Sequence, residues 1–170
     1  SASSPHKYVV RTSSWEEKRI VEDNNDFTER NSAFVQSSME FDQLEVNGEK
    51  LNYWMIKPSD FDSTKSYPTM FMIYGGPGSN TVTDSWGGSN YFWHQMLSQQ
   101  GYVIVSVDPR GTMRKGRAFK HSTYQQLGKL ETEDMIDAAQ YFGGMEYVDA
   151  ERIGIMGWSY GGYMSSLCLT

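Results

Sequence analysis

After Pro68 the chain alternates short, nearly continuous apolar runs with longer segments that carry apolar residues on one helical face. A short apolar run is typical of a strand buried on both sides of a sheet. Apolar residues three and four apart are typical of an amphipathic helix. The predicted strands are Thr69–Tyr74, Tyr102–Val107 and Arg152–Met156, and the predicted helices are Asn90–Gln99, Glu131–Phe142 and one starting at Ser159. This rhythm predicts an α/β fold with a mostly parallel sheet and helices on both faces.

The two complete helices are expected to bury their apolar stripes against the sheet. In the first helix the stripe consists of Phe92, Trp93, Met96 and Leu97. In the second helix it consists of Met135, Ala138, Ala139 and Phe142, and the first turn carries Glu131, Glu133 and Asp134. Acidic side chains in a first turn suit the positive end of the helix dipole.

The first half of the chain is predicted to form short β elements. Lys7–Arg11 and Lys18–Glu22 are short strands that cannot bury a core alone, so they indicate the end of a larger β structure. Further on, Phe41–Val46 and Lys50–Lys57 flank Asn47-Gly48, which is the strongest short-range signal for a hairpin turn.

The strongest motif is Gly157-Trp158-Ser159-Tyr160-Gly161, which follows the last predicted strand and opens the last predicted helix. This is the G-x-S-x-G nucleophile elbow in its strand–turn–helix context. A serine hydroxyl is a poor nucleophile unless it is held exposed, beside a base and at a helix N-terminus. Gly157 and Gly161 let the strained turn pass close to its neighbours, where a Cβ would clash. We therefore predict that Ser159 is a catalytic nucleophile.

A glycine-rich bend, Tyr74-Gly75-Gly76-Pro77-Gly78-Ser79, follows the strand that ends at Tyr74. It lacks the Gly-Lys-Ser/Thr of a phosphate loop, so an oxyanion hole is the better interpretation. The backbone N–H of Tyr160, directly after the nucleophile, would supply one donor and the Tyr74 hydroxyl the other. The alternative is that Tyr74 is a core aromatic and the glycines only turn the chain.

Asp108-Pro109-Arg110-Gly111 follows the next predicted strand. Two interpretations are open for this pair of charges. Asp108 and Arg110 could bind a substrate carboxylate, or they could form a structural ion pair that holds the loops. Because strand C-termini meet at one edge of a parallel sheet, Tyr74, Asp108 and Ser159 are expected at the same edge.

The base that would activate Ser159 is not evident. In this arrangement the chain order is Ser, then Asp or Glu, then His, and neither an acid nor a histidine follows Ser159. The histidines His6, His94 and His121 all lie upstream, and His94 and His121 are predicted to be surface or packing residues. We therefore expect this chain to be a piece of a larger enzyme and to be inactive alone.

Composition narrows the function classes. Asp and Glu number 21 and Lys and Arg 15, for a net charge of −6, which argues against nucleic acid and against an anionic membrane surface. No cluster of His, Cys and carboxylates has metal-ligand spacing, so neither a metal nor a cofactor is expected. Cys168 is the single cysteine, so no internal disulfide can form.

Four motifs follow one another along the chain: the Tyr74–Gly78 loop, Asp108-Pro109-Arg110-Gly111, Leu127-Gly128 with Glu131–Asp134, and Gly157–Tyr163. Together they resemble the prolyl oligopeptidase family of serine peptidases, most closely its dipeptidyl peptidase IV branch. The resemblance implies a β-propeller that precedes an α/β-hydrolase catalytic domain. On that basis residues 1–33 are the end of the propeller and residues 34–170 the N-terminal part of the α/β-hydrolase domain.

The same resemblance implies an activity. It is release of N-terminal dipeptides with Pro or Ala at the second position, from peptide substrates with a free N-terminus. The triad Asp and His would lie beyond Thr170. Alternatives are an acylaminoacyl peptidase or an oligopeptidase of the same family, and a catalytically dead binding homologue. The resemblance also implies a homodimer without cofactor, in the bacterial periplasm, at the cell surface or outside the cell.

Overall fold

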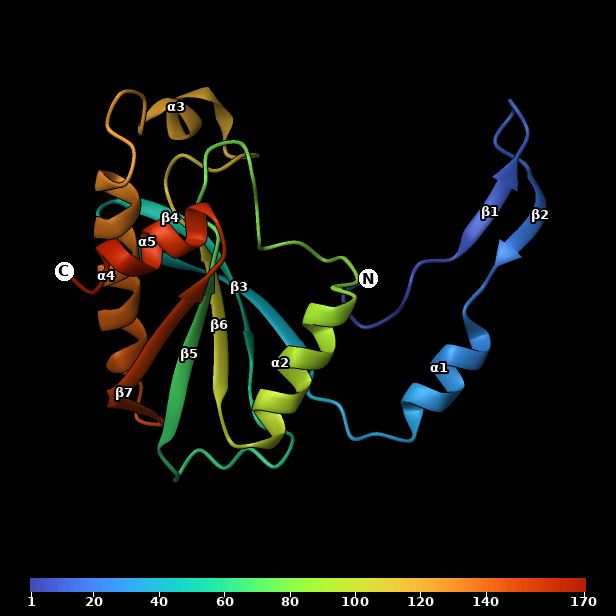
Figure 1. Cartoon of the computed structure of the whole chain (residues 1–170), viewed down its shortest axis with the longest axis horizontal. Coiled ribbons are helices and arrows are strands. Elements are labelled where there is room, and N and C mark those ends of the chain that lie inside the picture. The colour runs from blue at the N-terminus through green and yellow to red at the C-terminus, as the bar shows by residue number, and fades with distance from the viewer.

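The computed structural model of this protein describes residues 1–170 and contains two separate sheets (Figure 1). The small antiparallel sheet consists of β1 (Tyr8–Arg11) and β2 (Glu17–Glu22). The larger sheet consists of β3 (Met39–Val46), β4 (Glu49–Ile56), β5 (Tyr67–Ile73), β6 (Val103–Asp108) and β7 (Val148–Gly157). The helices are α1 (Asn25–Ser32), α2 (Ser89–Gln99), α3 (Gly116–His121), α4 (Lys129–Gly143) and α5 (Tyr160–Leu167).

The turn at Asn47-Gly48 joins the first two strands of the larger sheet, β3 and β4, as expected. Asn47 has φ 52° and Gly48 has φ 74°, and Val46 pairs with Glu49 across the turn. Positive φ at both central residues is the geometry of a type I′ hairpin turn, whose twist matches that of the strands. The predicted hairpin is therefore confirmed.

The larger sheet is mixed and not mostly parallel as predicted, because β4 adds two antiparallel pairings; its strand order is β3-β4-β6-β5-β7. The strand β5 pairs in parallel with β6 and with β7, whereas β4 is antiparallel to both β3 and β6. Only β4 therefore runs against the common direction. The C-terminal ends of β5, β6 and β7 consequently meet at one edge, which confirms the expected grouping of Tyr74, Asp108 and Ser159.

Both faces of this sheet are covered, because the buried side chains of β4, β5 and β6 alternate between two cores. Val103, Val105 and Val107 of β6 belong to the larger core, with side chains from α3, α4 and α5. Ile104 belongs to the smaller core on the opposite face, with Leu97 of α2. The predicted layering, helices on both faces of the sheet, is confirmed.

The face that α2 buries differs from the predicted one. Phe92, Trp93 and Met96 are each more than 40% exposed, so of the predicted stripe only Leu97 is buried. The buried side chains of α2 are those of Tyr91, Gln95, Leu97 and Ser98. Both the amide oxygen and the amide nitrogen of Gln95 bond the backbone of Ser37, at 2.7 and 2.9 Å. These hydrogen bonds turn a polar face of α2 inward, which an apolar pattern cannot reveal.

The inner face of α4 agrees better with expectation. Met135, Ala138 and Phe142 are buried in the larger core, and Ala139 is partly buried against it. Two acidic residues of the first turns, Glu131 and Asp134, are also fully buried. The prediction that these side chains only interact with the positive end of the helix dipole is therefore incomplete.

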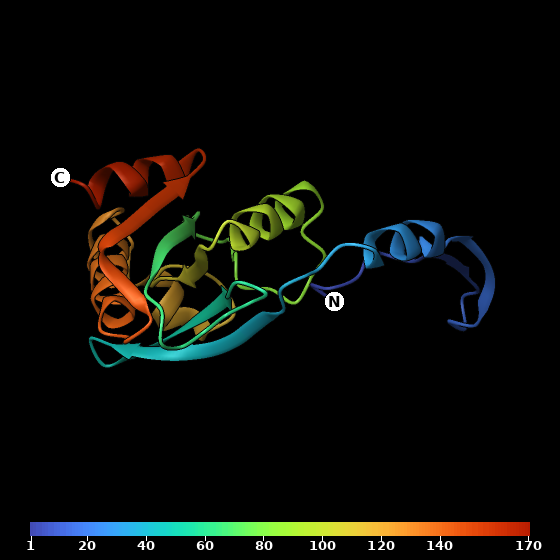
Figure 2. The same cartoon turned by 90° about the horizontal axis from the view of Figure 1, so that it is seen from below.

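The segment that holds β1, β2 and α1 projects from the body as an arm in both views (Figures 1 and 2). Both ends of this segment are attached to the body, because the Ala2 N–H donates to Asp84 and the Ser37 N–H donates to Gln95. The strands β1 and β2 pair only with each other, and every residue of β2 is exposed. The helix α1 has no buried residue and was not predicted, because Phe27 is its only large apolar side chain. That ring lies 5.9 Å from the rings of Trp86 and Phe92. None of the helices combines the length and apolar character that crossing a membrane would require.

Candidate active site

Ser159 occupies the tight turn between β7 and α5. Its backbone has φ 56° and ψ −118°, outside the regions that L-residues ordinarily populate, and its side chain is exposed. A residue is kept in such a conformation only where its surroundings over-determine it, and such strain clusters at functional sites. The neighbouring Trp158 is 89% exposed. The predicted elbow conformation is therefore present, while the nucleophilic role of Ser159 stays a prediction.

The two motif glycines are required by close backbone contacts. A Cβ on Gly157 would lie within 3.0 Å of the backbone of Gly161. A Cβ on Gly161 would collide with the carbonyl oxygen of Ile73, at the end of β5. The expectation that a Cβ would clash at both positions is confirmed.

Tyr74 follows β5, beside the turn that holds Ser159. Its ring centroid lies 6.2 Å from that of Tyr160, with the two planes tilted by 47°. Tyr74, Gly157 and Trp158 line one cavity of about 370 Å³. Tyr74 is partly buried and shares this cavity with the two residues that precede Ser159, near the place where an oxyanion donor is needed. The catalytic and packing interpretations of Tyr74 both remain compatible with this position.

Tyr160 has separate roles for its backbone and its side chain. As the first residue of α5, its N–H has no intrahelical acceptor and is free to bind an anion. Its phenol donates a 2.8 Å hydrogen bond to Oε1 of Glu131. Burial raises the pKa of Tyr160 above its ordinary value, and the Glu131 carboxylate raises that pKa further. The phenol is therefore protonated at any physiological pH.

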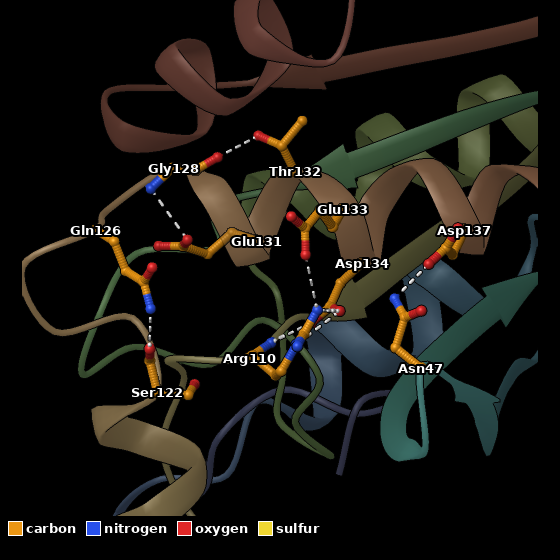
Figure 3. Close-up of polar contacts among 10 residues, drawn as sticks. All are labelled: Asn47, Arg110, Ser122, Gln126, Gly128, Glu131, Thr132, Glu133, Asp134 and Asp137. Atoms are coloured by element: carbon orange, nitrogen blue, oxygen red, sulfur yellow. Dashed lines mark hydrogen bonds and ion pairs between the residues drawn. The ribbon is translucent and has the colours of Figure 1, made fainter.

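Glu131, which sequence reasoning placed only at a helix dipole, is a fully buried carboxylate beside the elbow. Its Oε2 accepts a 3.0 Å hydrogen bond from the N–H of Gly128, the residue before α4 (Figure 3). The spacing Gly128 to Glu131 gives the half of a capping box in which the N3 carboxylate accepts from the N-cap N–H. This spacing is a signal in the sequence, beside the family motif that contains Glu131, that could have indicated its role.

Asp108 organises the loop that follows Tyr74. This carboxylate is 1% exposed and accepts hydrogen bonds from the Asn80 side chain, from Thr81 and from the Val82 N–H, at 2.7 to 3.2 Å. These contacts occupy both carboxylate oxygens. Asp108 therefore fixes a loop of the site and has no free oxygen with which to pair Arg110.

Arg110 instead pairs with the helix α4. Its Nε donates to both carboxylate oxygens of Asp134, at 2.8 and 3.0 Å, and its backbone N–H donates to the same carboxylate at 2.7 Å (Figure 3). Its guanidinium also lies 3.5 Å from the Glu133 carboxylate. Burial raises the pKa of Asp134, and the bonds from Arg110 work against that shift. The expected Asp108–Arg110 ion pair is therefore wrong, because each residue binds a different partner. The structural role of both residues stays a prediction.

No histidine is hydrogen-bonded to Ser159. His94 of α2 lies against Trp54, with ring centroids 5.1 Å apart, and burial lowers its pKa to about 4. His121 is exposed at the end of α3. The interpretation of His94 as a packing residue and His121 as a surface residue agrees with these positions. No group of three or more His, Cys, Asp or Glu side chains is arranged to hold a metal ion.

Comparison with known proteins gives a consistent result. Residues 89–170 match the model of the prolyl oligopeptidase family. The crystal structure of dipeptidyl peptidase 4 from Porphyromonas gingivalis superimposes on 99% of this chain with a TM-score of 0.93 and 40% sequence identity, and the match covers 24% of that chain.

Relatives known by sequence agree with this match. The "Probable dipeptidyl-aminopeptidase B" of Trichophyton verrucosum is 40% identical over 86% of this chain and 16% of its own length. The "Prolyl endopeptidase FAP" of Bos taurus is 40% identical over 91% of this chain and 20% of its own length. The chain thus spans about a fifth of the length of the relatives that it matches.

Proposed function

This chain belongs to the prolyl oligopeptidase family over residues 89–170, and on that premise we propose that Ser159 is the nucleophile of a serine peptidase. The observation that carries the proposal is the strained, exposed backbone of Ser159 at the first turn of α5. A turn of this kind presents the hydroxyl above the sheet edge and aims the adjacent helix N-terminus at the reacting carbonyl.

The proposed chemistry follows the serine hydrolase pattern. Oγ of Ser159 attacks the scissile carbonyl carbon while a histidine, supplied by sequence outside this chain, takes the hydroxyl proton. The Tyr160 N–H and the Tyr74 hydroxyl donate hydrogen bonds to the oxyanion of the tetrahedral intermediate. The amine then leaves with the proton from the histidine, and water hydrolyses the acyl-enzyme. Neither a metal nor a cofactor takes part in this scheme.

The proposed substrates are peptides with a free N-terminus, from which dipeptides with Pro or Ala at the second position are released. Support comes from two matched relatives whose names describe a dipeptidyl peptidase and a dipeptidyl-aminopeptidase. Residues 34–170 would then be the first part of an α/β-hydrolase domain, and residues 1–33 the end of a β-propeller. The separate small sheet of β1 and β2 supports that boundary.

A second candidate is an endopeptidase that cuts within the peptide chain. The relative from Bos taurus, which is named a prolyl endopeptidase, favours it. The two candidates differ in whether the substrate needs a free amino group. Chromogenic Gly-Pro and Ala-Ala dipeptides, each compared with its N-blocked form, separate them: a dipeptidyl peptidase cleaves only the free forms.

The nucleophile itself is tested by fluorophosphonate labelling of the full-length protein that contains this chain. Labelling is expected in the wild type and is expected to be lost in Ser159→Ala. Ser166→Ala is the matched control, because Ser166 is a serine on the same helix, α5. Labelling that persists in Ser159→Ala would reject the proposed nucleophile, and a wild type that is never labelled would favour the binding homologue.

A further inference from the structure

We infer that Glu131 is a positioning residue for the proposed oxyanion hole: it holds Tyr160, and with it the strained turn at Ser159, against the first turn of α4. The contact joins two elements that are 29 residues apart in the chain, through the Tyr160 hydroxyl and Oε1 of Glu131 at 2.8 Å. Because Ser159 is itself a proposed nucleophile, this role rests on the proposed function.

The environment of Glu131 is unusual for a carboxylate. Three carboxylates of this chain, Asp108, Glu131 and Asp134, are at most 1% exposed. Asp134 faces the Arg110 guanidinium, and Asp108 accepts four hydrogen bonds from one loop. Glu131 has no basic side chain within ion-pair distance. It has only the Tyr160 hydroxyl, the Gly128 N–H and the N-terminus of α4 to offset its desolvation.

A buried carboxylate with two neutral donors is a costly way to attach one tyrosine to a helix. An apolar pair would pack α4 against α5 at lower cost, so packing alone does not account for Glu131. What the carboxylate adds is direction. One of its oxygens accepts a hydrogen bond from the Tyr160 hydroxyl, and the other accepts one from the Gly128 N–H before α4, the second of which is drawn in Figure 3. The phenol is therefore held at one point.

Fixing the phenol matters because Tyr160 lies between two constrained neighbours. On one side is Ser159, whose φ and ψ are strained, and on the other is Gly161, which packs directly on the Ile73 carbonyl. The Tyr160 N–H would have to meet the oxyanion within a few tenths of an ångström to act. The constraints at Ser159 and Gly161 act on the backbone and leave the Tyr160 side chain free to move. The hydrogen bond to Glu131 restrains that side chain.

The test uses the full-length protein, with Glu131→Gln and Tyr160→Phe alone and combined. In Glu131→Gln only one of the two terminal side-chain atoms can still accept a hydrogen bond, whereas Tyr160→Phe keeps the ring and the backbone N–H. Tyr163→Phe is the matched control: it removes a phenol from the same helix, whose 3.4 Å hydrogen bond to the Leu127 carbonyl lies at the surface.

The measurements are kcat and KM per active site, counted by fluorophosphonate titration, and the melting temperature. We expect each single variant to lower kcat per site about ten- to a hundredfold with little change in KM, because a misplaced donor weakens only the transition state. The double variant is expected to lose no more than the worse single variant, since the two side chains act as one unit. Tyr163→Phe is expected to match the wild type.

A merely structural role would give a different result. Glu131→Gln would then lower the melting temperature or the number of titrated sites while kcat per site stayed at the wild-type value, and that outcome overturns the inference. Wild-type kcat in Tyr160→Phe overturns it also, even if Glu131→Gln fails to fold. A wild type that the fluorophosphonate does not label rejects the proposed function first and this role with it.

Discussion

Gly161 of α5 lies directly on the carbonyl oxygen of Ile73, at the end of β5, and leaves no room for a Cβ between them. The turn that carries Ser159 is therefore seated on the central strand of the parallel part of the sheet. Since the obstructing atoms are backbone, neither side can move aside as a flexible side chain would. The position of Ser159 is thus coupled to the position of Tyr74, which follows Ile73 in the chain.

Gly161→Ala tests this coupling. We expect it to lower the free energy of unfolding by about 3 kcal/mol, because an added methyl group in a packed contact forces backbone shifts. Labelling of Ser159 by a fluorophosphonate should slow as well. Urea denaturation and labelling rates measure the two effects.

Gly162→Ala provides the comparison for this prediction. The nearest atom to a Cβ on Gly162 is 3.4 Å away, and the residue lies within α5. That variant should be as stable as the wild type or slightly more so, because Ala favours helix over Gly. Equal stability of the two alanine variants would contradict the close-contact account.

Tyr74→Phe separates the catalytic from the packing interpretation of that residue. If the hydroxyl donates to the oxyanion, its loss should lower kcat about 10²- to 10³-fold and leave KM nearly unchanged. If the ring only packs, both constants should stay near their wild-type values. Tyr124→Phe, at a residue that is 73% exposed, is expected to have no effect in the same kinetic assay.

The Arg110–Asp134 pair should behave as a structural element. Asp134 is fully buried and the Arg110 side chain is 13% exposed, so Arg110→Met leaves a buried carboxylate uncompensated and should cost about 3–5 kcal/mol of unfolding free energy. Arg110→Met with Asp134→Leu should cost less than that single change, since neither charge is then left alone. Chemical denaturation measures both. A raised KM in Arg110→Met at unchanged stability would instead favour binding of a substrate carboxylate.

His94 should make stability depend on pH. Its folded-state pKa is about 4, below the ordinary 6.5, because burial beside Trp54 disfavours the imidazolium. Between these two pH values the unfolded chain binds a proton at His94 that the folded chain does not. The contribution of His94 to the free energy of unfolding is therefore fully present above pH 6.5 and is lost as the pH drops towards 4. The loss is at most about 3 kcal/mol.

The melting temperature at pH 7 and at pH 5 gives the measurement for His94. His94→Phe keeps an aromatic ring against Trp54 and cannot titrate, so its melting temperature should change less between the two pH values than that of the wild type. An identical change in both proteins would assign the pH dependence to other groups.

Features encoded by neighbouring residues could be predicted from the sequence. The Asn47-Gly48 turn needs only two residues that accept positive φ, and the elbow at Ser159 needs only a strand, two glycines and a helix start. The alternation of buried strands and helices likewise identified β5, β6 and β7 and the edge where they end. In each case the residues that signal the feature are neighbours in the sequence, although the contact of Gly161 with Ile73 and the strand pairing are themselves long-range.

Features that depend on distant partners could not be predicted. The inward face of α2 follows from hydrogen bonds between Gln95 and Ser37, which are 58 residues apart. The partner of Arg110 is Asp134 on α4 and not Asp108, which is only two residues away in the sequence, because Asp108 already binds the loop at Thr81. A pattern of apolar positions carries no information on such pairings.

One turn of α4 is hydrogen-bonded to two separate loops of this molecule. Glu131 contacts the turn after β7, and Asp134, three residues later on α4, contacts the loop after β6. Any tilt or slide of that helix would thus displace the serine and the arginine loop in concert. A suppressor screen started from a damaged serine turn should accordingly recover second changes beneath α4, where Met135 and Phe142 seat it on the sheet.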